Sequence, residues 1–120
     1  MGRDIEIQKL QELYSAVVFS YGAESDRDMK LQGEEKGGVF SSRQLVNWYN
    51  GLVDFDIDFD FSKVRDFSII GNGNVSMDIA RILLTDVKDL EKYDMPQRCI
   101  ERLKDSAVKN ISLIARRGIT

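Results

Sequence analysis

Residues 66–83 hold the feature that most constrains the fold, because a short apolar run there meets two closely spaced glycines and then helix-forming residues. Residues 66–70 predict a strand, and Gly71 with Gly73 predicts a tight turn. Apolar positions then recur at helical spacing, on a face that would cover a sheet: Val75, Ile79, Ile82 and Leu83. Strand, turn and helix in this order predict the first half of a βαβ unit, and therefore an α/β fold.

The glycine turn predicts a dinucleotide site. After a strand and before a helix, a first glycine permits the turn and a second lets a pyrophosphate approach the backbone, while free N–H groups at the helix start bind its charge. The third small position of the G-x-G-x-x-G fingerprint falls on Ser76, which weakens the match. The alternative is a βα turn with a purely structural role; the strand before the glycines and the helix after them favour dinucleotide binding.

Residues 108–115 predict a second strand of the buried type, ending at Arg116 and Arg117 before Gly118. This strand would complete the βαβ unit with parallel strands. The residue at its end faces the adenosine ribose, where an acid binds the 2′-hydroxyl of NAD and an arginine accommodates the 2′-phosphate of NADP. Because the guanidinium fork pairs bidentately with phosphate oxygens, the arginines favour NADP. The alternative is a pair of solvated arginines in a surface turn.

The crossover from the glycines to the arginines is longer than the usual spacing of about 20 residues. Residues 85–108 predict helical structure that accounts for the excess, with Leu90 and Tyr93 in its first part. Asp94 is the expected cap of a further helix that has Pro96 in its first turn. One face of that helix would carry Cys99, Ile100 and Leu103. Such an insertion leaves the return of the second strand beside the first unchanged.

The N-terminal half holds two further predicted elements. Residues 15–20, SAVVFS, are an uninterrupted apolar run with β-branched residues, which predicts a strand buried on both faces. Residues 41–52, SSRQLVNWYNGL, predict a short helix with Ser41 or Ser42 as its N-cap and Gly51 after its last turn.

Two segments predict connections or leave the choice open. Residues 24–38 are polar and contain glycine, which predicts an exposed connection. Residues 53–61, VDFDIDFDF, alternate between apolar residues and aspartate, which is the period of a half-buried strand. Because aspartate is a poor strand residue, an acidic surface connection with some buried phenylalanines is an equal alternative. As a functional patch the segment could attract a basic partner, although a solvated loop is favoured.

Composition excludes several classes of function. The chain has 20 acids against 17 lysines and arginines, a net charge of −3, which argues against a general nucleic-acid or anionic-membrane surface. It has no histidine, and Cys99 is its single cysteine, so disulfides, zinc sites and histidine-based triads within the chain are excluded. No apolar run has the length of a transmembrane span, and the first residues lack the apolar core of a secretory signal.

Four segments together resemble a known family. SYGAE, GEEKGGVFSSRQLVNWYNG, GNGNVSMDIARILL and ARRG are similar, in order and spacing, to segments of the adrenodoxin reductase family, the mitochondrial-type ferredoxin–NADP reductases. The resemblance covers almost the whole chain. It implies a two-domain flavoprotein that binds FAD on one Rossmann-like domain and NADPH on another. Hydride would pass from NADPH to FAD, and single electrons to a ferredoxin- or adrenodoxin-type iron–sulfur protein, in mitochondria.

The resemblance also implies roles for particular residues. The NADP pyrophosphate would be bound by Gly71, Asn72, Gly73, Asn74 and Val75, and the 2′-phosphate by Arg116 and Arg117. No catalytic acid or base and no metal ligand is expected, because the flavin does the redox chemistry in the complete enzyme.

The flavin fingerprint of the family does not appear in this sequence. We therefore expect a partial chain, with residues 1–24 as the end of a flavin-domain segment and residues 25–120 as the first half of the NADP-binding domain. Its fold would be a partial Rossmann-like domain with an exposed sheet edge and a small core, marginally stable and not catalytically competent alone. The alternative is a stand-alone, non-catalytic module that binds a nucleotide or a protein.

Overall fold

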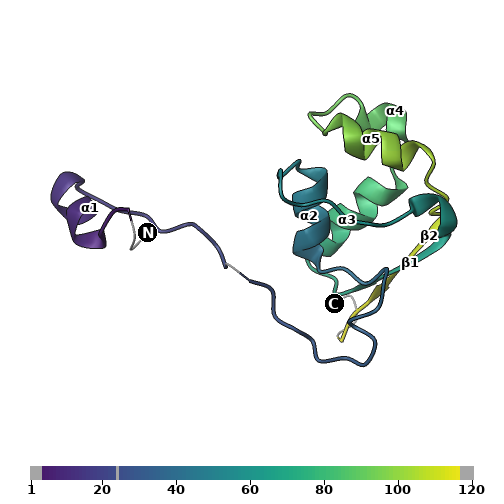
Figure 1. Cartoon of the computed structure of the whole chain (residues 1–120), viewed down its shortest axis with the longest axis horizontal. Helices are drawn as coiled ribbons and strands as arrows, with labels where there is room; N and C mark the ends of the chain where they lie inside the picture. The colour runs from purple at the N-terminus through teal and green to yellow at the C-terminus, as the bar shows by residue number, and fades with distance from the viewer. Residues whose placement is uncertain (1–3, 24, 117–120) are drawn as a thin grey trace.

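The computed structural model describes residues 4–23 and 25–116, and Figure 1 shows how their elements are arranged. The helix α1 (Ile7–Leu13) lies apart from the others at the end of an extended connection and buries none of its residues. The remaining elements gather into one α/β body. They are α2 (Ser42–Tyr49), the 3₁₀ helix η1 (Phe61–Lys63), β1 (Asp66–Ile70), α3 (Asn74–Leu84), α4 (Val87–Leu90), α5 (Gln97–Lys104) and β2 (Asn110–Ile114).

The predicted βαβ unit is present. β1 and β2 pair in parallel, with Asp66 opposite Asn110 at one end and Ile70 opposite Ile114 at the other. Between them the chain passes through α3, α4 and α5, which confirms the helical crossover and the α/β class. The carboxyl ends of both strands therefore lie at the same end of the sheet.

In the described part of the chain, the core covers one face of this sheet. Ile69 is buried and Phe67 packs against the core, whereas Ile70 and Ile114, which point to the other face, are more than half exposed. The second strand was predicted as buried and as running over residues 108–115, and both points need correction. The observed strand is shorter, and most of its residues are exposed because nothing in the described chain covers its outer face or its second edge.

The helix α2 begins as the sequence predicts. Ser41 is its N-cap, and a capping box joins Ser41 and Gln44, each side chain accepting from the other residue's backbone N–H. Trp48 on this helix is fully buried and stacks on Phe61, with 5.4 Å between the ring centroids. The core gathers buried side chains from α2, α3 and α5: Leu45, Trp48, Ile79, Ile82, Leu83, Cys99, Ile100 and Leu103.

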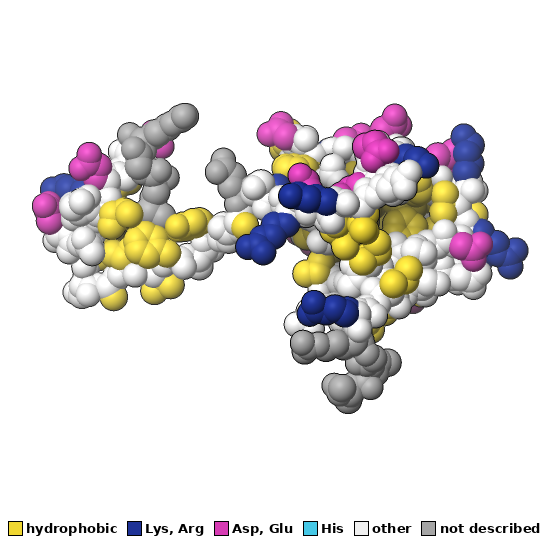
Figure 2. All heavy atoms as spheres, turned by 90° about the horizontal axis from the view of Figure 1, so that it is seen from below, with side chains coloured by type: hydrophobic (Ala, Val, Ile, Leu, Met, Phe, Trp, Pro, Cys, Tyr) yellow, Lys and Arg dark blue, Asp and Glu magenta, His cyan; other side chains and the backbone are white. Residues whose placement is uncertain are grey.

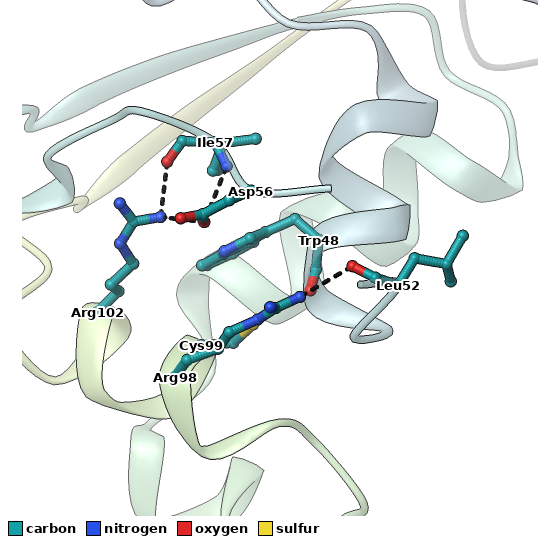
Figure 3. Close-up of polar contacts among 7 residues, drawn as sticks. All are labelled: Trp48, Leu52, Asp56, Ile57, Arg98, Cys99 and Arg102. Carbon is teal, nitrogen blue, oxygen red and sulfur yellow. Dashed lines mark hydrogen bonds and ion pairs between the residues drawn. The ribbon is translucent and has the colours of Figure 1, made fainter. Parts of the chain in front are cut away.

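The acidic segment 53–61 is a surface connection and not a strand. Ile57 and Phe61 are buried, so two apolar side chains of the segment pack into the core. Arg102 on α5 donates to the Asp56 carboxylate at 2.8 Å and to the Ile57 carbonyl oxygen at 2.6 Å (Figure 3). Ion pairing to α5 explains how a segment rich in aspartate can lie close against the body.

Three further predictions about elements were wrong. Residues 15–20 form no strand in the described chain, and Val18 is 85% exposed, because the two described strands pair with each other and leave this run without a partner. Asp94 does not cap α5; Pro96 occupies the N-cap position, without a side-chain hydrogen bond. Val75 was expected to face the sheet but is about half exposed.

The predicted exposed connection at residues 24–38 is confirmed over its described residues, most of which are exposed and lie in turns or irregular structure. Among the described residues, no helix combines the length and the apolar character needed to cross a bilayer.

Candidate functional site

The glycine turn follows directly from the end of β1. The Gly71 N–H donates to the Ile114 carbonyl oxygen at 2.8 Å, which extends the parallel ladder by one bond beyond the strands. Gly71 has φ of +125°, a conformation that side chains with a Cβ rarely adopt. The turn is therefore fixed to the carboxyl end of β2, where the predicted arginines follow.

The second glycine is different, because nothing in the described protein requires it. Gly73 is the N-cap of α3, with an ordinary φ of −79°, and no atom lies within 4 Å of the place where its Cβ would be. The start of α3 has no side-chain cap and no acid in its first turn. The first N–H groups of a helix have no intrahelical partner, and they carry the positive end of its dipole. The turn therefore presents open space next to an uncapped helix start.

Ser76 occupies the third small position and faces the first glycine. A Cβ placed on Gly71 would lie 3.2 Å from the Ser76 Oγ, so α3 and the end of β1 approach closely here. A larger side chain at position 76 would push the helix away from the strand. Serine therefore satisfies the packing requirement of the fingerprint, although the fingerprint calls for glycine or alanine.

The structure brings most of the predicted site residues to one end of the sheet. Residues 71–75 follow β1, and Arg116 follows β2 by two residues at the same end and is exposed. Asn72, Asn74 and Val75 are exposed as well. Arg117, the second predicted arginine, lies outside the described residues.

A groove that sequence reasoning missed begins beside this turn. It has a volume of about 520 Å³, starts at Val75 and continues along α3 to Tyr49 at the end of α2 and Tyr93 after α4. On its wall, Asp78 and Arg81 pair at 3.5 Å across one turn of α3. Burial raises the pKa of Tyr49, Asp78 raises it further, and Arg81 opposes them. Tyr49 lies in one of the four segments that carry the resemblance, but only the packing of α2 on α3 shows that it lines a groove.

The described chain offers no candidate metal site, and its single thiol is buried. Cys99 is a free thiol, fully buried, and donates to the Trp48 carbonyl oxygen at 3.2 Å. Burial raises the pKa of this thiol, which disfavours the reactive thiolate. The described chain holds no cluster of acids and cysteine suited to a metal ion. The arrangement can bind an anionic group at a helix start.

Comparison with known proteins shows which proteins this chain is similar to. It is 44% identical to the bovine mitochondrial NADPH:adrenodoxin oxidoreductase over 98% of its own length and 24% of that protein. The corresponding mitochondrial proteins of Arabidopsis thaliana (40%, covering 25% of that protein) and Homo sapiens (44%, covering 24%) match over the same 98% of the chain. The chain is homologous to one segment of the adrenodoxin reductase family. It spans about a quarter of the length of the curated relatives it matches.

The solved structures agree with this similarity to a segment of the adrenodoxin reductases. The Mycobacterium tuberculosis FprA in complex with NADPH superposes with a TM-score of 0.78 at 36% identity, covering 95% of this chain and 25% of that one. No protein-family model matches the chain. The resemblance drawn from the four sequence segments and the expectation of a partial chain are therefore confirmed, as is the partial α/β fold.

Proposed function

We propose that this chain is the NADP-binding part of a flavoprotein reductase of the adrenodoxin reductase type. The relatives it matches are named for NADPH and adrenodoxin, and a solved relative contains NADPH. In the complete enzyme NADPH supplies a hydride to FAD, from which single electrons pass to a ferredoxin- or adrenodoxin-type iron–sulfur protein. We place the enzyme in mitochondria because the plant, mammalian and yeast relatives carry that location in their names.

The observation that carries the proposal is Gly73. Within the described protein, neither its φ nor its surroundings require glycine, and the space beside it is open. A pyrophosphate that lies against the backbone at the start of α3 would require glycine here, because a Cβ would occupy its place. The described residues fit such a group: the helix start is uncapped, carries no acid and faces open space.

Cofactor selection is assigned to the arginines after β2. Gly71, Asn72, Gly73, Asn74 and Val75 would hold the pyrophosphate, and Arg116 and Arg117 the 2′-phosphate. The register supports this assignment, since Ile114 lies opposite Ile70 and Arg116 follows at the same end of the sheet. A guanidinium there would add a charge-assisted contact that only the phosphorylated cofactor can make.

The division of the chain belongs to the same proposal. Residues 1–24 would be the end of a flavin-domain segment, and residues 25–120 the first half of the NADP-binding domain. The described residues support it in that α1 and the extended run after it lie apart from the α/β body (Figure 1). The main FAD site would lie in the rest of the protein, and the redox chemistry with it.

Calorimetric titration of the chain with NADP and, separately, with NAD tests the proposal. We expect NADP to bind and NAD to bind more weakly. In an Arg116→Ala, Arg117→Ala double variant, the affinity for NADP should fall to that for NAD. The affinity for NAD should stay the same, because NAD has no 2′-phosphate for these arginines to contact.

Circular dichroism of each sample provides the control for folding. A folded chain that binds neither nucleotide, or one that binds NAD and NADP equally, would contradict the assignment of the arginines. The stand-alone, non-catalytic module remains the alternative. It would be supported by in-frame stop codons on both sides of this segment in the gene, whereas an upstream glycine-rich flavin motif would support the reductase.

A further inference from the structure

The side chains of Asp26, Ser41 and Arg43 form a group of polar contacts where the chain enters the α/β body. The Asp26 carboxylate accepts from the Ser41 hydroxyl at 2.6 Å through one oxygen and pairs with the Arg43 Nε at 3.4 Å through the other. The Arg43 Nη1 also donates to the Ala23 carbonyl oxygen at 3.2 Å. Both carboxylate oxygens and two guanidinium nitrogens are therefore used to hold Ala23 and Asp26 against the start of α2.

The Ser41 hydroxyl performs two tasks at once. Its oxygen accepts from the Gln44 N–H at 3.2 Å as the N-cap of α2, and its proton is donated to Asp26. A hydroxyl is suited to this because it is both a donor and an acceptor. The cap of α2 and the attachment of the incoming chain thus share a single side chain.

The position of Asp26 adds an electrostatic contribution. The first turn of α2 contains no acid of its own, and Asp26 brings a carboxylate to that helix start. A negative charge near a helix N-terminus interacts favourably with the helix dipole. The Arg43 and Asp26 side chains are only 35% and 39% exposed, so solvent screens their ion pair less than one on the open surface.

Other hydrogen bonds between residues 4–23 and the body are not found in the described chain. The turn bonds of α1 end at Tyr14, and the next backbone pair joins Glu34 to Leu31. The intervening run contains the apolar residues 16–19, of which Val18 and Phe19 are exposed, and Figure 2 shows hydrophobic side chains at the surface of the N-terminal part. The direction of this segment thus depends on the contacts of Ala23 and Asp26.

We propose that Asp26, Ser41 and Arg43 form a latch that fixes the direction in which residues 4–23 leave the α/β body. The consequence for catalysis rests on the proposed function, in which these residues belong to the flavin side and the body binds NADP. The latch then sets how the two cofactor-binding parts face each other. Arg43 and Asp26 are positioning residues in this scheme, because they touch neither cofactor.

The latch is tested by measuring a distance across it. Spin labels are attached at Ser20→Cys, on the incoming segment, and at Lys88→Cys, on α4, both of which are exposed; Cys99 is fully buried. Double electron–electron resonance then reports the distribution of distances between the two labels. With the latch intact we expect one peak that is narrow relative to the distribution in variants that break the latch.

The decisive variant is Ser41→Asp. Aspartate is a good N-cap and can still accept from the Gln44 N–H, but it has no proton to donate and it repels Asp26. We expect the narrow distance peak to be lost while the melting temperature of the body is unchanged. Arg43→Gln should also lose the peak, because it removes the ion pair.

The matched control is Gln44→Ala, which removes half of the capping box and leaves the latch residues in place. It should lower the melting temperature and keep the narrow peak. An equally broad distribution in the unsubstituted chain and in Ser41→Asp would overturn the latch, as would a narrow peak in Ser41→Asp. Titration of the same samples with NADP separates the two proposals, since the latch can fail while NADP binding persists, and the reverse.

Discussion

At the scale of single residues, Gly73 is the position where protein packing and ligand binding make different demands. Gly73→Ala has room for its Cβ and an allowed φ, so the free energy of unfolding should change little. The same Cβ would stand where we place the pyrophosphate. An overpacking cost of roughly 1–2 kcal/mol in the complex corresponds to about a tenfold loss of NADP affinity. Calorimetry and urea unfolding of the same sample measure both quantities.

Gly37→Ala is the matched control for this prediction. Gly37 also has no atom within 4 Å of its Cβ position and no left-handed φ, and it lies in the exposed connection before α2. It should leave both stability and NADP affinity unchanged. Unaltered NADP affinity in Gly73→Ala would contradict the placement of the pyrophosphate.

For Gly51 we expect a substitution to alanine to destabilise the fold, unlike at Gly73, because here the protein itself requires glycine. Its φ is +79°, and a Cβ would come within 2.6 Å of the Pro96 ring. A left-handed conformation costs a residue with a Cβ about 1–2 kcal/mol, and overpacking against a stiff ring costs about 1–3 kcal/mol. We expect Gly51→Ala to lower the free energy of unfolding by about 2–5 kcal/mol in urea titrations. If the free energy of unfolding fell no more than in Gly37→Ala, the backbone at Gly51 and the Pro96 ring would be shown to move apart at little cost.

At the scale of elements, the 3₁₀ helix η1 begins with a carboxylate that should make stability depend on pH. The Asp60 carboxylate accepts from the Ser62 hydroxyl at 2.6 Å and the Ser62 N–H at 3.0 Å and pairs with Lys63 at 2.9 Å. The Ser62 hydroxyl, followed by Lys63, lowers the pKa of Asp60 from its usual 3.8 to about 2. A carboxyl whose pKa is lower in the folded state stabilises the fold when ionised. Its contribution is therefore complete above about pH 4 and is lost as the pH falls through about 2.

Asp60→Asn isolates this contribution, because asparagine can still cap η1 but cannot ionise. Unfolding free energies of both proteins should be compared from pH 6 to pH 2. We expect the difference between them to be constant above about pH 4 and to shrink below it. A difference that stays constant down to pH 2 would show that the Asp60 charge does not stabilise the fold.

Local signals predicted the helices and the turn better than the strands. The capping box at Ser41 and the helical spacing of Ile79, Ile82 and Leu83 are contained within a few residues, so α2 and α3 follow from the sequence. The alternation in residues 53–61 has the period of a strand, but its ion pair comes from Arg102, far along the chain. Burial of a strand depends on partners that periodicity does not identify, which is why residues 15–20 were assigned wrongly.

At the scale of the whole molecule, the sequence predicts which end of the sheet carries the site. It does not predict the groove that lies beside the site. Parallel pairing places Gly71 and Arg116 at one end once both strands are recognised. The groove from Val75 to Tyr49 depends on how α2 packs against α3, and no sequence motif predicts that packing. Both outer edges of the two-stranded sheet are open in the described chain, and this supports the expected marginal stability of the α/β body.

Stability should also be divided unevenly along the chain. Among the described residues, the buried hydrophobic side chains all lie between Leu45 and Val108, whereas α1 buries none and most of the run after it is exposed. Chymotrypsin should therefore cut first at the exposed aromatic residues Tyr14, Phe19 and Tyr21, because local opening there costs little. The fragment that remains should melt at the temperature of the whole chain, since it keeps the entire described core. A lower melting temperature after this cut would mean that the N-terminal residues stabilise the body, and slow cleavage would mean that they are held more firmly than the latch alone allows.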